Sequence, residues 1–440
     1  MAFTLRSYQR SAVESVLAEW SKGHRSTLLV MATGTGKTVV FAEVVRRWMA
    51  THPNRHVLVM AHRRVLVEQA KAKMRDMRNV DVTTVQAANL QAPKADPAKY
   101  GLIVIDEAHH TLAKSYRNVI RHYADAKVLG VTATPERADG SDMGEVFDSV
   151  AYSYDMADAI SDGYLSQVRV CSAPLAVDLS GVHTKQGDYD TAELANAVEP
   201  LLNSAASWIK SIAPDRHVVV FLPLVDTAKK MAEICRAHGI AAEEIDGQSD
   251  NKDAVLKRFE SGQTRVLCNA ALLTEGWDAP ICDCVMVLRP TQSRALYVQM
   301  VGRGTRLHEG KTDVLVPDVL ALNARHDVMR PADVLIKDHD RAVEVMEAAT
   351  TEPKTVAQLE ADRDYQAERE ASIIAAMNGA HRGMTESAKR RPKAGKGGLA
   401  RRAAVMAGRI VVNTFKFTFG LIGAIIADMI GVDFKTPEFI

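Results

Sequence analysis

The feature that most constrains the fold is a glycine-rich loop near the amino terminus, MATGTGKT at Met31–Thr38. An apolar, β-prone run precedes it at Ser26–Met31, and a pattern suited to a helix follows at Lys37–Met49. A strand, loop and helix in this order create a phosphate site, because backbone N–H groups and the helix N-terminus face one point. The sequence therefore predicts a parallel α/β fold that binds a nucleotide.

The side chains of this loop have predictable tasks. Lys37 is expected to reach the β and γ phosphate oxygens, and Thr38 to offer its hydroxyl to Mg²⁺. Met31 replaces the first glycine of the general pattern, which leaves a plain glycine-rich turn as the alternative. The Gly-Lys-Thr ending argues against that turn, so we expect ATP and Mg²⁺ as ligands. The residues expected to hold the nucleotide here are Thr33, Gly34, Thr35, Gly36, Lys37 and Thr38.

A second site, which is acidic, is predicted in IDEAHH, at Ile105–His110. The aliphatic run Leu102–Ile105 is typical of a buried strand, and it delivers Asp106 and Glu107 to its carboxyl end, where ligands bind in α/β sheets. Asp106 is expected to hold Mg²⁺ and Glu107 to orient and deprotonate the attacking water. The alternative is a solvated acidic turn, which does not explain the apolar strand directly before it.

Composition limits the class of protein but not its ligand. The chain has 440 residues, 47% of them hydrophobic and 25% charged, which suits two or three globular domains. The net charge of +1 requires any nucleic-acid surface to be local. Five cysteines without paired CxxC spacing and an amino terminus without an apolar leader predict reduced thiols and a cytoplasmic location, nucleoid-associated if the source is prokaryotic or a phage.

Short apolar runs alternate with helical patterns in two successive series, which predicts two RecA-like parallel-sheet lobes in tandem with a helical C-terminal extension. The strand-like runs are 57–61, 102–105 and 128–132 in the first series, and 218–222, 266–269, 284–288 and 314–316 in the second. We place the first lobe at residues 1–165, the second at 166–345 and an accessory helical and basic tail at 346–440. The mixed segment from 166 to 215 is expected to connect the lobes.

The tail carries no recognisable chemistry. Residues 382–402 are basic and glycine-containing, which predicts a flexible linker that either touches phosphates or only solubilises the chain. The apolar stretch Ala403–Ile430 contains an uncharged run of only eleven residues, Phe417–Ala427, whereas a spanning helix needs about twenty. We favour a packing helix or hairpin, with a membrane-surface or membrane-inserting tail as the alternative, because basic residues precede the stretch.

Further motifs follow in an order that resembles the superfamily-two DNA helicases. LRSYQ at Leu5–Gln9 resembles the adenine-reading element, with Gln9 as reader, and VTATP at Val131–Pro135 resembles the element that links hydrolysis to lobe movement. The extension TATPERADGSDMGEVFD, continued by Asp162–Leu165, is similar to repair-type DEAH helicases, phage branch-migration helicases and type III restriction motor subunits. The resemblance covers about Leu5–Leu307, most of the chain.

The resemblance also assigns roles in the second lobe. TEGWDAP at Thr274–Pro280 resembles the element that senses nucleotide and strand, which implies nucleotide contacts by Gly276 and Asp278 and a nucleic-acid contact by Thr274. QMVGRGTR resembles the arginine-finger element; the residues whose side chains it brings to the γ-phosphate or the attacking water are Gln299, Arg303 and Arg306. A guanidinium suits developing phosphate charge, whereas an exposed helix face is the alternative.

Nucleic-acid contacts are the least specific part of the resemblance. By their place in the family's strand-gripping elements, the implied residues are His62, Arg63, Thr84 and Gln86, although His62 and Arg63 could be ordinary turn residues. His109 is the histidine that the family uses to couple the ATP site to the other lobe; a satisfied core imidazole is the alternative.

The sequence therefore predicts an ATP-dependent DNA helicase or translocase. Its partner is expected to be single-stranded, forked or branched DNA, and RNA remains a possible partner. The rivals are an RNA helicase, a nucleic-acid-stimulated ATPase switch or motor subunit without autonomous unwinding, and a phosphate-loop kinase. The arginine-finger element in a second lobe disfavours the kinase. The chain shows no amino-terminal damage-recognition domain and no nuclease motif, which weakens the more specialised repair and restriction roles.

Overall fold

The architecture is that of a computed structural model of the whole chain. The part that the structure describes comprises residues 4–62, 64–110, 113–134, 143–173, 175, 177–185, 187–247, 251–270, 272–274, 277, 279–319 and 328–365. These residues belong to one unit of internal contacts that ends at Tyr365. The basic linker and the apolar Ala403–Ile430 segment predicted from the sequence lie outside the described residues.

The first lobe contains a parallel sheet in the order β3-β2-β4-β5-β1-β6. Its strands are β1 (Ser26–Met31), β2 (His56–Ala61), β3 (Val80–Thr84), β4 (Tyr100–Asp106), β5 (Lys127–Thr132) and β6 (Ser149–Tyr154). The four strands predicted from apolar runs are confirmed. The two edge strands were missed, because β3 and β6 are only partly buried and lack a continuous apolar run.

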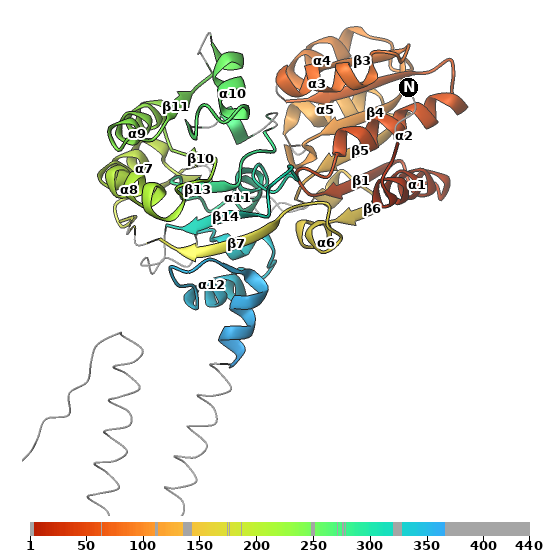
Figure 1. Ribbon diagram of the computed structural model, residues 1–440. Coiled ribbons are helices and arrows are strands. Elements are labelled where there is room, and N and C mark those ends of the chain that lie inside the picture. The colour runs from red at the N-terminus through yellow and green to blue at the C-terminus, as the bar shows by residue number, and fades with distance from the viewer. Residues whose placement is uncertain are drawn as a thin grey trace, which may run out of the picture. The chain divides into compact units, whose positions relative to one another are not determined.

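Helices cover both faces of this sheet, as the strand pattern requires (Figure 1). The helices are α1 (Ser7–Ser21), α2 (Lys37–Thr51), α3 (Arg64–Met74), α4 (Val85–Gln91) and α5 (Lys114–His122). Alternate residues of a strand point to opposite faces. Leu29 and Met31 of β1 therefore pack in the cluster with α1, α2 and α3, whereas Leu28 and Val30 pack in the cluster with α4 and α5.

The second lobe contains a sheet in the order β11-β12-β10-β13-β14-β7-β15. Its strands are β7 (Gln167–Ser172), β10 (Val218–Phe221), β11 (Ala242–Ile245), β12 (Val266–Asn269), β13 (Cys284–Val287), β14 (Asp313–Asp318) and β15 (Lys354–Thr355). The four strands predicted here are confirmed, and all neighbours pair in parallel except β15 with β7. Two parallel-sheet lobes in tandem are therefore the observed fold class. The strand β15 lies beyond residue 345, at which the second lobe is predicted to end. The domain boundaries stay predictions.

The helices of the second half also divide between two apolar clusters. The helices that follow β6 are α6 (Met156–Ser161), α7 (Thr191–Val198), α8 (Leu202–Ile212), α9 (Val225–Ala237), α10 (Lys252–Glu260), α11 (Arg294–Val301) and α12 (His339–Glu347). The strands β8 (Thr184–Lys185) and β9 (Asp188–Tyr189) form a separate small hairpin. Helices α7, α8 and α9 pack on one face of the sheet, and α10, α11 and α12 contribute to the cluster on the other. The segment 166–215 is thus part of the second lobe and not only a connection.

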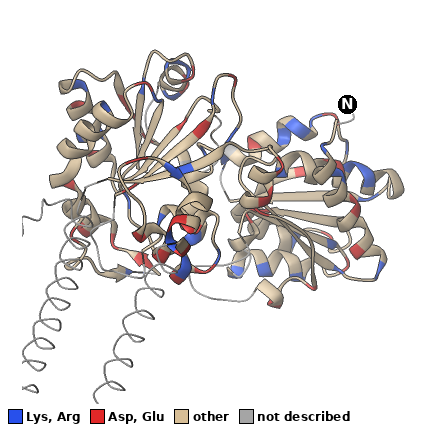
Figure 2. Ribbon diagram, turned by 60° about the horizontal axis from the view of Figure 1, so that its bottom comes forward, with Lys and Arg blue, Asp and Glu red and all other residues tan. Residues whose placement is uncertain are grey.

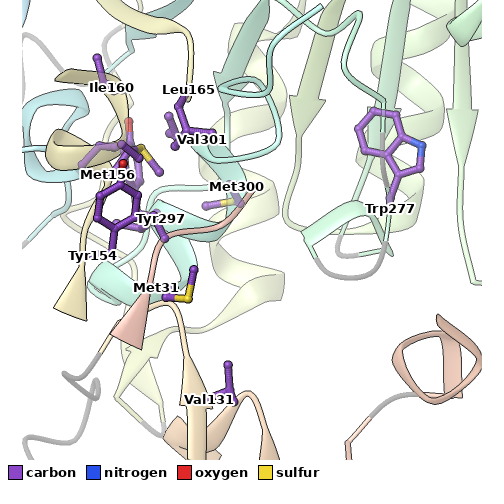
Figure 3. Packing of buried hydrophobic residues seen from close by; sticks show 14 of the residues in the cluster. Met31, Val131, Tyr154, Met156, Ile160, Leu165, Trp277, Tyr297, Met300 and Val301 are labelled. Atoms are coloured by element: carbon purple, nitrogen blue, oxygen red, sulfur yellow. The ribbon is translucent and has the colours of Figure 1, made fainter. Parts of the chain in front are cut away.

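One apolar cluster runs through both lobes. It includes Met31 and Tyr154 at the ends of two first-lobe strands, Leu165 in the connection, and Met300 and Val301 in α11 (Figure 3). Ser166 also donates its N–H to the carbonyl of Thr305 at 2.6 Å. These contacts bring the arginine-bearing segment after α11 close to the phosphate loop after β1.

Basic and acidic residues are mixed over the described part of the chain. Figure 2 shows Lys and Arg interspersed with Asp and Glu, and the net charge of the chain is +1.

All five cysteines are buried and free of disulfides. Among the described helices, none is both long enough and apolar enough to span a bilayer.

Candidate active site

The phosphate loop joins β1 to α2, as predicted. Gly34 and Gly36 have φ angles of +87° and +85°, which a residue with a Cβ rarely adopts. The hydroxyl of Thr35 donates to the carbonyl of Ala32 at 2.7 Å, closing the loop on itself. Helix α2 begins at Lys37, so the N–H groups of its first turn face the concave side of the loop.

Two side chains of α1 tie the outside of this loop. The hydroxyl of Tyr8 and the amide Nε2 of Gln9 both donate to the carbonyl of Thr35, at 2.8 and 2.9 Å. The Oε1 of Gln9 accepts from the backbone N–H of Arg6 at 3.1 Å. An amide has two N–H donors and two acceptor lone pairs, so Gln9 keeps one of each for an adenine edge. Its role as adenine reader stays a prediction, and its bond to the loop is the observed contact.

The acidic pair lies at the end of β4. Asp106 and Glu107 are 7% and 8% exposed, and burial together with the charge of Glu107 raises the pKa of Asp106 to about 7, although Lys37 opposes the shift. Glu107 has a φ of +52°, an uncommon conformation for glutamate that marks functional sites. Its Oε2 is buried and accepts no hydrogen bond from a described residue. A buried carboxylate oxygen in this state suits a group that acts on water.

His109 connects two motifs of the first lobe. Its Nδ1 lies 3.3 Å from the hydroxyl of Thr132 and 3.4 Å from Glu107 Oε2. Thr132 in turn donates to the carbonyl of Thr134 at 2.8 Å, within the VTATP motif. The structure therefore places His109 between the DEAH box and the motif thought to report on hydrolysis. Its coupling to the other lobe stays a prediction.

The arginines of the second lobe converge on one carbonyl. Arg303 and Arg306 each donate an Nη1 hydrogen to the backbone oxygen of Trp277, at 2.7 and 3.0 Å. Gly302 allows a close approach to the first lobe, because a Cβ there would lie 2.9 Å from Cβ of Thr33. The turn after α11 therefore reaches the phosphate loop directly.

A cavity of about 580 Å³ unites these groups. From the first lobe it is lined by the phosphate loop and the acidic pair, and from the second by the arginine turn and the carbonyl that anchors it. The predicted site residues that line it are Thr33, Gly34, Gly36, Lys37, Thr38, Asp106, Glu107, Arg303 and Arg306. Four predicted residues do not line the cavity, namely Gln9, Thr35, His109 and Gln299, and the last is buried in α11.

The structure adds residues that motif reasoning missed. Arg6 and Tyr164 line the cavity, and the Arg6 guanidinium carbon lies 5.1 Å from the centre of the Tyr164 ring. The ring of Tyr8 stacks on Tyr154 at 4.3 Å and meets Tyr164 edge-on at 4.7 Å. The signals were present, because Arg6 and Tyr8 lie inside LRSYQ and Tyr164 lies inside the Asp162–Leu165 extension. A cation and two aromatic rings within these motifs are the signal that points to this side of the cavity.

The residues predicted to contact nucleic acid fall partly inside the described structure. His62 follows β2, and Ala61 pairs in register with Thr84, so His62 and Thr84 lie at the same carboxyl edge of the sheet. The Thr84 hydroxyl caps α4 by accepting from the N–H of Ala87 at 3.3 Å. Gln86 is exposed in α4. Arg63, Gly276, Asp278 and the side chain of Thr274 lie outside the described residues.

The chemistry of the lining fits a nucleotide bound together with magnesium. The described residues contain no group of three or more His, Cys, Asp or Glu that could hold an ion. Magnesium usually keeps its waters and takes one or two protein oxygens beside substrate phosphates. The Asp106 carboxylate and the Thr38 hydroxyl, which both line the cavity, supply such a pair.

Comparison with known proteins finds helicases and restriction enzymes. The family described as type III restriction enzyme, res subunit, matches residues 2–82 and 73–137, and the helicase conserved C-terminal domain matches residues 200–308. The putative ATP-dependent helicase IRC3 of Saccharomyces cerevisiae is 29% identical over 373 residues, which cover 76% of this chain and 54% of the yeast protein. The chain thus spans about half the length of the curated relatives it matches.

Two solved structures share the fold. A fragment of a putative HsdR subunit of a type I restriction enzyme from Vibrio vulnificus superposes with a TM-score of 0.60 and 24% identity, over 77% of this chain and 67% of that one. The type ISP restriction-modification enzyme LlaBIII bound to DNA superposes with a TM-score of 0.55 and 18% identity, over 71% of this chain and 27% of that one. Because helicase-type family models match both lobes, the chain belongs to the superfamily-two helicases, and the names of its relatives are consistent with the group of repair and restriction helicases.

Proposed function

We propose that the chain is an ATP-dependent DNA translocase that couples hydrolysis of ATP to movement along DNA, with unwinding or branch migration as its result. The observation that carries the proposal is the shared cavity, in which one lobe supplies Lys37 and the acidic pair and the other supplies Arg303 and Arg306. A site divided between two lobes makes the chemistry depend on their approach, and the approach depend on the nucleotide.

The residues of the cavity account for phosphoryl transfer to water. The water oxygen bonds to the γ-phosphorus while Glu107 accepts its proton, and the bond from the γ-phosphorus to the bridging oxygen breaks with its electron pair on ADP. Lys37 binds the β and γ oxygens, and the two arginines meet the charge that develops on the transferred group. When bound, Mg²⁺ neutralises phosphate charge, and Asp106 and Thr38 would hold it.

Nucleic acid would bind at the carboxyl edge of the first sheet. His62 and Thr84 lie at this edge, where β2 pairs with β4, whose end carries Asp106; Gln86 follows Thr84 in the first turn of α4. One edge of the sheet holds both the catalytic carboxylates and the candidate nucleic-acid contacts. Hydrolysis of the nucleotide can therefore move the residues that bind the nucleic acid. Of the similar proteins named above, the restriction enzyme bound to DNA favours DNA over RNA, whereas the name ATP-dependent helicase specifies neither polymer. A cytoplasmic location stays a prediction.

The test is ATP hydrolysis measured with no nucleic acid and then with single-stranded DNA, duplex DNA, forked DNA and RNA. We expect stimulation by DNA and displacement of a strand from forked DNA. Stimulation by RNA alone would replace the proposal with an RNA helicase. Stimulation without displacement of a strand or of a bound roadblock would replace it with a switch or a motor subunit.

A further inference from the structure

A lysine that belongs to none of the motifs lies directly behind the arginine turn. The ammonium of Lys311 donates to the backbone carbonyls of Cys282 at 2.6 Å, Arg306 at 2.8 Å and Pro280 at 3.2 Å. It also donates to the carbonyl of Gly304. An ammonium has only three N–H donors, so four acceptors saturate it.

This arrangement replaces the water around a charged group with protein dipoles. Lys311 is largely removed from solvent, and this burial lowers the pKa of its ammonium. Burying a cation is costly unless polar partners compensate. Four carbonyl oxygens do so here, which makes Lys311 a fixed part of the second lobe and not a mobile surface side chain.

The four carbonyls come from two segments that both reach the cavity. Pro280 ends the TEGWDAP element and Cys282 follows it, whereas Gly304 and Arg306 belong to the arginine turn. A turn returns the chain so that Lys311 can reach them: its N–H donates to the carbonyl of His308 at 3.1 Å. Gly310 within this turn has a φ of +79°. Lys311 therefore bridges the two elements without lining the cavity itself.

Arg306 is consequently held at both of its ends. Its guanidinium donates to the carbonyl of Trp277, and its own carbonyl accepts from Lys311. The backbone of the turn also has little room to shift, since a Cβ on Gly304 would lie 2.5 Å from Val314 and 2.7 Å from Val285.

We infer that Lys311 is a positioning residue for hydrolysis, which fixes the backbone of the arginine turn so that Arg306 meets the γ-phosphate. The inference rests on the proposed role of Arg306. Misplacing a reacting group by about 1 Å can cost roughly 10²-fold in rate. Removing Lys311 should therefore slow turnover without weakening the binding of ATP, because the phosphate loop that binds ATP is untouched.

A lysine that only stabilised the fold would behave differently, and a matched control exists. Lys127 in β5 donates its ammonium to the carbonyl of His24 at 2.7 Å and lies at the amino end of its strand, away from the cavity. Lys311→Met and Lys127→Met each delete one partly buried ammonium and keep the length of the side chain. Both should lower the melting temperature, but only Lys311→Met should lower kcat.

The experiment measures kcat and KM for ATP, with saturating DNA, for Lys311→Met, Lys127→Met, Arg306→Ala and the double variant Lys311→Met with Arg306→Ala. We expect Lys311→Met to lower kcat by about 10- to 100-fold with KM nearly unchanged. In the Arg306→Ala background the same change should lower kcat by less than about twofold, because Lys311 acts through Arg306. If Lys311→Met does not fold, Lys311→Arg takes its place, since it keeps the charge without a compact ammonium.

The outcomes separate the two proposals. An unchanged kcat in the Lys311 variant, or an equal loss in both backgrounds, would overturn the positioning role while leaving the proposed function intact. A normal kcat in Arg306→Ala would instead remove Arg306 from catalysis, and the positioning role would fail with it.

Discussion

The two halves of the cavity are built in different ways. In the first lobe, Lys37 starts a helix and Glu107 directly follows a strand, so the local chain geometry alone delivers them. In the second lobe, Arg303 and Arg306 are anchored on Trp277, which precedes them by 26 and 29 residues, and Lys311 fastens the turn from behind. The first half-site is therefore suited to bind nucleotide unaided, whereas the second supplies charge whose position depends on the tertiary structure of its own lobe.

The comparison is tested most severely by removing the arginines. Arg303→Ala and Arg306→Ala should each lower kcat by up to about 10³- to 10⁵-fold, the range known for arginine fingers, while ATP affinity changes little. Steady-state ATPase assays with DNA and equilibrium binding of ATP measure the two effects. Arg236→Ala is the control, because Arg236 also donates to a backbone carbonyl of the second lobe, that of Ala242 at 2.9 Å, away from the cavity. A loss of affinity equal to the loss of rate would contradict the division of labour.

Within the first half-site, the lysine and the glutamate should separate binding from chemistry. Glu107→Gln should lower kcat by about 10²- to 10⁴-fold, the usual contribution of a general base, while still binding ATP. Lys37→Ala should bind ATP poorly as well, because it loses the cation that holds the phosphates. Glu43→Gln serves as the control, since Glu43 is a buried carboxylate of α2 that pairs with Arg46 and Arg47. Normal hydrolysis by Glu107→Gln would exclude Glu107 as the base.

A smaller effect should follow from separating the half-sites. In Gly302→Ala the new Cβ would meet Thr33 at 2.9 Å and force the arginine turn away from the phosphate loop. We expect up to about a tenfold loss of kcat, because a displacement well below 1 Å suffices to relieve this contact. Gly181→Ala is the matched control, since nothing lies within 4 Å of a Cβ at that position. Identical kinetics for the two variants would show that the lobes need not approach this closely.

The smallest change is expected from loosening the outside of the phosphate loop. Tyr8→Phe removes the hydrogen bond to Thr35 but keeps the stacked ring, and Gln9 still donates to the same carbonyl. The free energy of unfolding should fall by about 0.5–1.5 kcal/mol, with kcat unchanged. Thermal melting with and without ATP measures this. A large rise in KM for ATP would mean that Tyr8 shapes the loop and does not merely secure it.

Strand prediction succeeded where burial is complete and failed at the edges. The continuous apolar runs of β1, β4, β10 and β12 marked strands covered on both faces, and the structure confirms them. The edge strands β3 and β6 are mostly partly buried and mix apolar with polar residues, so their sequences resemble loops. The strand β7 was missed within the segment thought to connect the lobes.

The sequence by itself determined the half of the site that depends on neighbours along the chain. Glycines that adopt positive φ, a lysine that starts a helix and carboxylates that follow a strand are fixed by local sterics and strand geometry, so their positions follow from the motif. Only the tertiary structure decided that Tyr8 and Gln9 secure the loop, that Arg6 and Tyr164 line the cavity, and that Lys311 fastens the arginine turn. Most of those contacts join residues distant in the chain. They end on backbone carbonyls or on an aromatic ring, and no sequence motif records which carbonyl or ring is the partner.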